Sequence, residues 1–128
     1  MSSQIASIED VNSMLTKTKQ YIDDENIHFQ EREKNMEYLN TNGISIDDAL
    51  TYVYEMDHHN YSKGPEEDRD TKFAPGDVWI FGLPEGFIPD TAVNDEVYVK
   101  LKELLQTDRM ICLSFHKAQW PISYAYPR

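Results

Sequence analysis

Two runs of alternating apolar and polar residues between Val97 and His116 predict an antiparallel β-hairpin. A polar turn, TDR at 107–109, separates the two runs. Successive strand side chains point to opposite faces of a sheet. The predicted core face carries Val97, Val99, Leu101, Ile111, Leu113 and Phe115. The opposite face carries Tyr98, Lys100, Lys102, Cys112, Ser114 and His116, and it stays open to ligands if the sheet is covered on one side only.

Apolar residues at helical spacing predict three helices in the first half of the chain. They are expected from about Ile8 to Asp24, from Glu31 to Asn40, and after Ser45. Capping residues precede the first and third helices, and Asn-Gly at 42–43 follows the second. A short extended piece is expected at 27–29. Few polar groups meet on these helices, which we therefore interpret as the cover of one sheet face.

The rest of the chain lacks such regular patterns. Gly, Pro and charged residues between 57 and 77 predict a long loop, and VWIF at 78–81 predicts a short strand. The tail, KAQWPISYAYPR at 117–128, is rich in aromatic residues and is expected to pack back on the domain. The chain thus divides into a helical half at 7–56, a loop at 57–77 and a sheet half at 78–128. The predicted fold is one α+β domain over 1–128, with N-terminal helices packed on one face of a small antiparallel β-sheet.

Length and composition fit a cytoplasmic globular protein. The 128 residues, 40% of them hydrophobic, suffice for one domain with its own core. The single cysteine, Cys112, cannot form an internal disulfide, which favours a reducing compartment. The N-terminal sequence MSSQIASIED lacks the basic and apolar regions of a signal peptide, and no stretch is long and apolar enough to span a bilayer. We therefore expect no contact with a membrane.

Charge is distributed unevenly along the chain. The net charge of -11 argues against a nucleic-acid ligand, because phosphate contacts need Lys and Arg. From Val97 to Arg128, however, five basic residues stand against two acidic ones, a net of +3 that leaves -14 on the remainder. This asymmetry can turn a polyanion toward the hairpin, or it can favour a basic protein partner. A solvated acidic surface without a ligand explains it equally well.

Several familiar chemistries have no signature in this sequence. It contains no Gly-rich phosphate loop, no HExxH motif and no paired cysteines. His58 and His59 are adjacent, and neighbouring side chains seldom converge on one metal ion. The acidic run at 66–70 lacks the order of a calcium loop. We expect neither a metal nor a cofactor.

The predicted open face of the hairpin suits metal-free RNA cleavage. That reaction needs a base for the 2′-hydroxyl proton, a cation for the charge on the phosphoryl oxygens and an acid for the leaving 5′-oxygen. His116 can serve as acid or base near neutral pH. Tyr98 can position a phosphate, or transfer a proton if its pKa is lowered, and Lys63 and Lys100 can supply positive charge. Such residues are also common on solvated strands, and His116 can simply bridge the strand to the tail.

Four segments resemble, in order and spacing, the MqsR-type toxins of bacterial type II toxin-antitoxin systems, a branch of the RelE-like ribonuclease superfamily. They are NYSKGPEEDRD, VWIFG, EVYVKLK and MICLSFHKA. The segment REKNMEYLNTNGISIDDAL is similar to the helical half of members from Gram-positive bacteria, and the resemblance runs from about Phe29 to Tyr126. It implies a RelE-like domain whose open sheet face receives mRNA. It also implies an endoribonuclease (mRNA interferase) that is neutralised by a cognate antitoxin, often a helix-turn-helix DNA-binding protein.

The resemblance also implies roles for single residues. The tyrosine of the family's VYLK-like strand falls on Tyr98, and the basic residue after its VSF-like segment falls on His116. The loop lysine falls on Ser62 or Lys63, depending on a shift of one residue, and we choose Lys63. These choices make Lys63, Tyr98 and His116 the predicted catalytic residues. The predicted RNA-binding residues are Lys100, Lys102, Arg109 and Lys117. Where some members have Gln after the Trp, this chain has Ile80, so that role is unfilled.

The alternative function is a non-catalytic acidic interaction module that binds a basic partner protein. The two hypotheses differ in a geometric expectation. A ribonuclease requires Lys63, Tyr98 and His116 to converge around a phosphate-sized hollow, whereas an interaction module does not.

Overall fold

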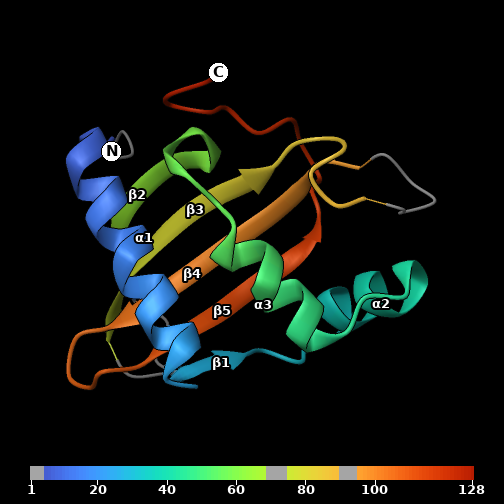
Figure 1. The fold of residues 1–128 in the computed structure, drawn as a ribbon, viewed down its shortest axis with the longest axis horizontal. Helices are drawn as coiled ribbons and strands as arrows, with labels where there is room; N and C mark the ends of the chain where they lie inside the picture. The colour runs from blue at the N-terminus through green and yellow to red at the C-terminus, as the bar shows by residue number, and fades with distance from the viewer. Residues whose placement is uncertain (1–4, 69–74, 90–94) are drawn as a thin grey trace.

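Helices cover one face of a β-sheet in the computed structural model, which describes residues 5–68, 75–89 and 95–128 (Figure 1). The described elements are α1 (Ile8–Asp23), β1 (Ile27–Phe29), α2 (Glu33–Asn42), α3 (Ile46–Tyr54), the 3-10 helix η1 (His58–Asn60), β2 (Tyr61–Asp68), β3 (Gly76–Leu83), β4 (Val97–Leu104) and β5 (Met110–Lys117). α1 and α3 lie across the sheet, and α2 lies beside β5. The predicted α+β fold with N-terminal helices on one sheet face is confirmed. No helix in the described ranges has the length and apolar character that a membrane span requires.

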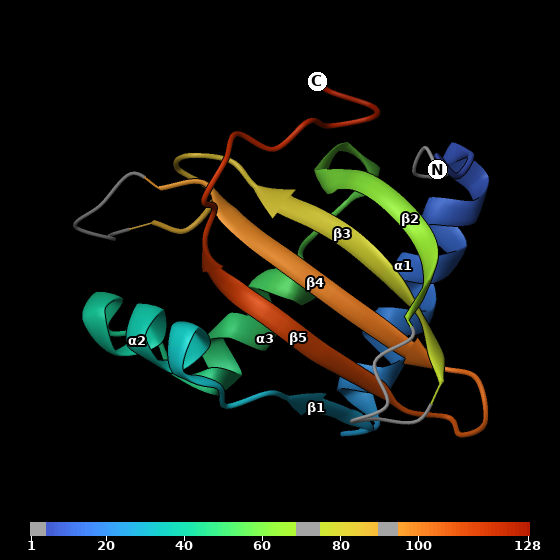
Figure 2. The same ribbon diagram turned by 180° about the vertical axis from the view of Figure 1, so that it is seen from behind.

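The five described strands form one mixed sheet in the order β1-β5-β4-β3-β2. The predicted hairpin is present as β4 and β5, and β2, β3 and β4 are likewise antiparallel to their neighbours. β1 instead runs parallel to β5, with Ile27 opposite Met110. The expectation of a wholly antiparallel sheet is therefore wrong at this edge. Seen from behind, β3, β4 and β5 have no helix in front of them (Figure 2).

β2 occupies much of the stretch that the sequence predicted to be a loop. Gly64 and Pro65 interrupt its pattern, and its register with β3 shifts on both sides of Lys63. Proline is tolerated in β2 because this strand lies at the edge of the sheet, where one row of backbone groups needs no partner strand. Tyr61 is fully buried and anchors the strand to the core. The edge position thus explains a strand whose composition resembles a loop.

The helix boundaries follow the capping residues of the sequence. The Ser7 hydroxyl accepts a hydrogen bond from the Asp10 N–H at 3.1 Å, and Ser45 and Asp48 form a reciprocal capping box at α3. α2 ends at Gly43, which adopts a left-handed φ of 65° that favours glycine. The predicted starts of α1 and α3 are confirmed, whereas α2 is shifted toward the C-terminus by about two residues relative to the prediction.

The core lies between the helices and the sheet. It contains apolar side chains from α1, α2, α3 and the inner face of β3, β4 and β5. Val11, Phe81, Leu101 and Phe115 have no exposed surface, and full burial of such side chains stabilises a fold by roughly 1.5–3 kcal/mol each. Cys112 also lies in this core, where burial raises the pKa of its thiol to about 12 and keeps it protonated.

A β-bulge in β5 decides which side chains face the core. Across from β4, Lys100 pairs with Ser114 and Leu101 pairs with Cys112, so Leu113 is an extra residue. Met110 and Cys112 precede the bulge and face the helices. Beyond the bulge the alternation is reset, so that Phe115 faces the core.

The bulge also corrects part of the predicted hairpin. Phe115 lies in the core, and Ser114 and His116 line the opposite face, as the alternation predicted. The assignment was wrong for the residues before the bulge. Ile111 and Leu113 belong to a small apolar cluster outside the main core, and Cys112 is in the core. Strict alternation cannot anticipate an inserted residue.

A buried side chain of α2 holds the bulge in place. The Asn35 amide nitrogen donates to the Gln30 and Leu113 carbonyl oxygens at 2.8 and 3.0 Å. The Asn35 carbonyl oxygen accepts from the Phe115 N–H at 3.0 Å. Asn35 has no exposed surface. Its side chain therefore satisfies two backbone groups of the bulge that lack the regular ladder partners.

We expect Asn35→Ala to destabilise the protein by at least about 2 kcal/mol, because buried backbone groups of Leu113 and Phe115 lose their partner. Asn40→Ala, on the exposed face of the same helix, is the matched control and should change the stability by no more than about 0.5 kcal/mol. Urea unfolding measures both values. Equal midpoints for the two variants would show that Asn35 does not support the bulge.

Candidate active site

The uncovered face of the sheet carries a pocket of about 570 Å³ beside the C-terminal end of β5. Strands β2, β4 and β5, the start of α2 and the C-terminal segment all contribute to its walls. Its basic lining residues are Arg32, Lys34, Lys63, Lys100 and His116. No Asp or Glu of the described chain lines it. On a protein with a net charge of -11, this pocket is a local site of positive charge that suits an anion.

The three predicted catalytic residues line this one pocket, although they come from three different strands. Tyr98 of β4 and His116 of β5 are direct cross-strand partners, and their ring centroids are 5.6 Å apart. Lys63 of β2 is exposed at the same pocket. The hollow also exceeds the roughly 300 Å³ at which small-molecule pockets begin. The three residues thus line one hollow, as the ribonuclease hypothesis expects, and their catalytic roles stay a prediction.

The predicted RNA-binding residues are dispersed. Lys100 lines the pocket, and Lys117 lies just beyond it, within 3.4 Å of an Asp95 carboxylate oxygen. Lys102 has no exposed surface, and its ammonium lies 2.9 Å from an Asp68 carboxylate oxygen. The prediction that Lys102 contacts RNA is therefore wrong, because this lysine forms a buried ion pair.

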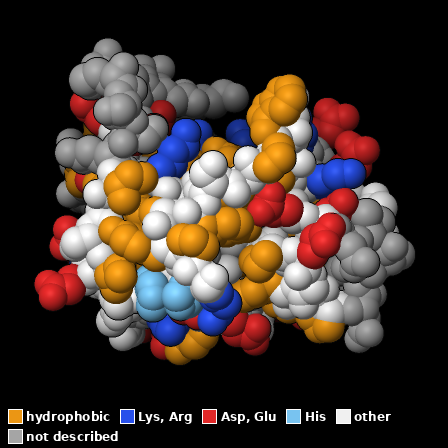
Figure 3. Space-filling model, turned by 90° about the horizontal axis from the view of Figure 1, so that it is seen from above, with side chains coloured by type: hydrophobic (Ala, Val, Ile, Leu, Met, Phe, Trp, Pro, Cys, Tyr) orange, Lys and Arg blue, Asp and Glu red, His pale blue; other side chains and the backbone are white. Residues whose placement is uncertain are grey.

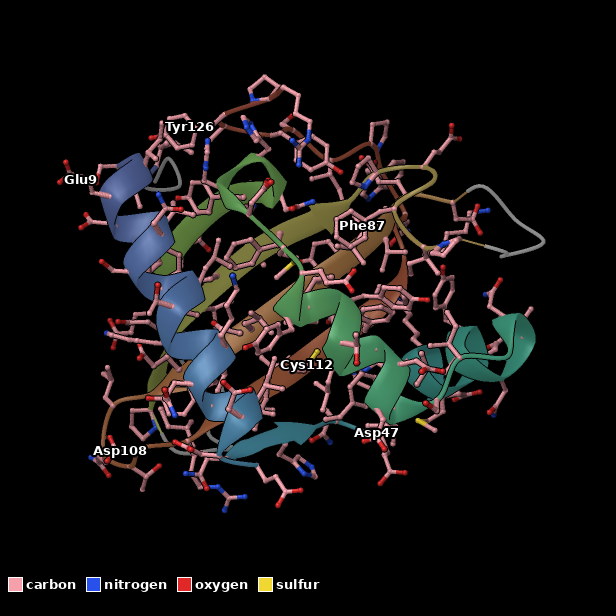
Figure 4. All side chains as sticks on the ribbon, in the orientation of Figure 1. Glu9, Asp47, Phe87, Asp108, Cys112 and Tyr126 are labelled. Carbon is pink, nitrogen blue, oxygen red and sulfur yellow. The ribbon has the colours of Figure 1, made fainter. Side chains whose placement is uncertain are left out.

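Arg109 lies outside the pocket, in the turn between β4 and β5. Its neighbour Asp108 lies near the bottom of the view in Figure 4, whereas Tyr126 of the C-terminal segment lies near the top. The structure thus places Arg109 away from the pocket that Lys100 lines.

The imidazole of His116 is arranged as a base. Its Nδ1 lies 2.9 Å from the Lys117 carbonyl oxygen. A carbonyl oxygen can only accept a hydrogen bond, so Nδ1 carries the hydrogen, and Nε2 of the neutral ring has the free lone pair. Burial lowers the pKa of His116, the bond to Lys117 partly opposes this, and the nearby Lys34 and Arg32 lower it further. His116 is therefore neutral at neutral pH and able to accept a proton.

Tyr98 has the opposite character. Burial raises the pKa of its phenol, the charge of Glu66 raises it further, and Arg32 partly opposes both effects. The phenol therefore keeps its proton at neutral pH and can donate a hydrogen bond. A lowered pKa, which proton abstraction by Tyr98 would have required, is not found.

Sequence reasoning missed the two basic residues that α2 brings to the pocket. Arg32 is the N-cap of α2, and its guanidinium donates to the Ser114 hydroxyl at 2.6 Å. Lys34 follows in the first turn. Cations at this end of a helix oppose the helix dipole, which favours acidic residues there. The unfavourable placement of these two cations was the one feature of the sequence that could have indicated a role for them. No feature of the sequence indicated the parallel pairing of β1 with β5, which brings α2 to the pocket.

The C-terminal segment forms one wall of the pocket. The Glu96 carboxylate accepts from the Ile122 N–H at 2.8 Å and from the Tyr124 hydroxyl at 2.7 Å. The Ser62 hydroxyl of β2 donates to the Ser123 carbonyl oxygen at 2.7 Å. The segment is therefore fixed to both β2 and the start of β4.

The rest of this segment also packs on the domain. Tyr126 stacks on Tyr61 with ring centroids 6.1 Å apart, and its hydroxyl donates to the Ala6 carbonyl oxygen at 2.5 Å. The expected packing of the tail is confirmed, except that Trp120 is 74% exposed. From the end of the molecule that carries this segment, Lys and Arg side chains are visible beside hydrophobic ones (Figure 3).

The described residues contain no group of three or more His, Cys, Asp or Glu side chains placed to hold a metal ion. The His58 and His59 rings lie against each other with centroids 4.1 Å apart. His59 Nδ1 donates to the Tyr126 carbonyl oxygen at 2.7 Å. This histidine pair thus contributes to the docking of the C-terminal segment.

This chain has no significant match among protein-family models, curated proteins or solved structures. Its function is therefore inferred from the pocket and from the resemblance of its sequence segments.

We expect the His116 ring to titrate below the ordinary value of 6.5, because burial and two nearby cations disfavour its charged form. NMR of the ring nitrogens as a function of pH measures the midpoint and identifies the nitrogen that carries the hydrogen in the neutral form. The arrangement predicts hydrogen on Nδ1. A midpoint above 6.5, or hydrogen on Nε2, would contradict the assignment of His116 as a base.

Proposed function

We propose that this protein is a metal-independent endoribonuclease that cleaves mRNA, and that it is the toxin of a type II toxin-antitoxin system similar to the MqsR-type toxins. One observation carries the proposal. Lys63, Tyr98 and His116 line a single basic pocket that has no Asp or Glu of the described residues in its lining. A non-catalytic interaction module gives no reason for this convergence.

In the proposed reaction, His116 is the general base. Its Nε2 takes the proton of the 2′-hydroxyl while the 2′-oxygen attacks the adjacent phosphorus. The bond from the 2′-oxygen to phosphorus forms, and the bond from phosphorus to the 5′-oxygen breaks. The Lys63 ammonium gives its proton to the leaving 5′-oxygen. The products are a 2′,3′-cyclic phosphate and a 5′-hydroxyl end, and no metal is needed.

The remaining pocket residues stabilise the charge that develops on the phosphoryl oxygens. Lys100 and Arg32 supply positive charge, and the protonated phenol of Tyr98 donates a hydrogen bond. Arg32 is oriented by its contact with Ser114 at 2.6 Å. Because this contact fixes the guanidinium before the substrate binds, Arg32 needs little reorganisation as the phosphate reacts.

The acidic surface outside the pocket is compatible with this function. Phosphate contacts require local cations, whereas the remaining negative charge repels RNA and limits non-specific binding. We further propose that the protein acts in the cytoplasm, has a RelE-like fold and is neutralised by a cognate antitoxin protein. The antitoxins of the resembling family are often helix-turn-helix proteins, which makes that class the first to test.

The proposal is tested by incubating purified protein with transcripts in the presence of EDTA and mapping the new 5′ ends. We expect cleavage that leaves 5′-hydroxyl ends. His116→Ala should lower the rate by about 10²- to 10⁴-fold, because it removes the general base. His28→Ala, an exposed histidine of β1 outside the pocket, is the matched control and should retain the wild-type rate.

Two outcomes would contradict the proposal. In one, folded wild-type protein leaves all transcripts intact. In the other, His116→Ala and His28→Ala cleave RNA at the same rate, which would place the activity outside this pocket.

A further inference from the structure

Trp120 is the most exposed large hydrophobic side chain of the described residues, with 74% of its surface accessible. It lines the basic pocket together with Pro121 and Ile122. An exposed indole contributes little to a core, and Trp79, the other tryptophan, is by contrast 7% exposed. The position of Trp120 therefore calls for an explanation other than folding.

The backbone on both sides of Trp120 is fixed. The Ala118 N–H donates to the Glu96 carbonyl oxygen at 2.8 Å, and the Ile122 N–H donates to the Glu96 carboxylate at 2.8 Å. Trp120 lies between these two anchors, so its backbone is held at the pocket although its ring is exposed to solvent. With the backbone already anchored, only the two side-chain torsions of the indole lose freedom when a ligand stacks on it, which keeps the entropy cost small.

An aromatic platform beside clustered cations is the chemistry by which proteins hold single-stranded nucleic acids. Cations contact the backbone phosphates, and the bases stack on aromatic rings. We propose that Trp120 stacks on a base of the RNA next to the phosphate that is cleaved at His116. This inference rests on the proposed function, and it assigns Trp120 as a substrate-positioning residue.

The surroundings of His116 indicate how the bound RNA is oriented in the pocket. A second hollow of about 360 Å³ adjoins the pocket, and three residues line both: Lys34, His116 and Gln119. His116 thus stands where the two hollows meet. Trp120 lines only the first hollow. The stacked base therefore belongs to the nucleotide on the first-hollow side of the cleaved phosphate.

The test compares two probes that share phosphates but differ in bases. The first is a short single-stranded RNA with 2′-O-methyl groups, which lacks the hydroxyl nucleophile and is not cleaved. The second is inorganic tripolyphosphate. Trp120→Ala should weaken binding of the RNA by on the order of tenfold and leave tripolyphosphate binding unchanged, because only the RNA offers a base to stack. Trp120→Phe should retain most of the RNA affinity.

Leu105→Ala serves as the matched control, because Leu105 is 62% exposed but lies away from the pocket. It should change the affinity for neither probe. Calorimetry or a fluorescence titration gives the affinities, and cleavage of unmodified RNA is measured on the same samples.

Each other outcome overturns the inference in a recognisable way. Wild-type cleavage with unchanged RNA affinity in Trp120→Ala would leave the proposed function standing and remove the stacking role, so that the exposed indole would instead suit a protein contact. Equal weakening for both probes would show that Trp120 only supports the shape of the pocket. If wild-type protein neither binds nor cleaves RNA, the proposed function fails and the inference fails with it.

Discussion

The hydrogen bonds from the buried Asn35 side chain to the β-bulge of β5 are the constraint on which the candidate site depends. Met110 and Cys112 face the core before the bulge. If β5 continued past Cys112 as a regular strand, strict alternation would turn Ser114 and His116 into the core as well. The bulge instead sends His116 to the open face opposite Tyr98. The fold and the site thus share one local irregularity, which explains why a fully buried polar residue occupies a helix that packs on the sheet.

The same contact links the site to α2. Asn35 joins this helix to β5, and the preceding turn then places Arg32 against the Ser114 hydroxyl and Lys34 at the pocket. These cations help to keep His116 neutral, and they offer charge to a phosphate. A protein of strongly negative net charge can therefore present a compact positive pocket, because binding responds to the charges within about a Debye length rather than to the total.

Regular local patterns were readable from the sequence, whereas irregular and long-range features were not. The periodicity and caps of α1 and α3 and the alternation in β4 predicted those elements, and the placement of Tyr98 and His116 on one face followed from the hairpin. The bulge at Leu113 and the edge strand β2 break the simple period, so alternation failed there. The burial of Lys102 and the arrival of Arg32 depend on contacts between distant segments, which a single sequence does not reveal.

The central claim is that RNA binds at the pocket on the uncovered face of the sheet. The most direct measurement is an NMR titration of isotope-labelled protein with a 2′-O-methyl RNA at low salt, with amide shifts assigned along the chain. Binding at the pocket predicts that the largest changes lie at residues such as Lys63, Lys100 and His116, and that they diminish as salt is added. Absence of changes there, or changes confined to the outer surfaces of α1 and α3, would contradict the account.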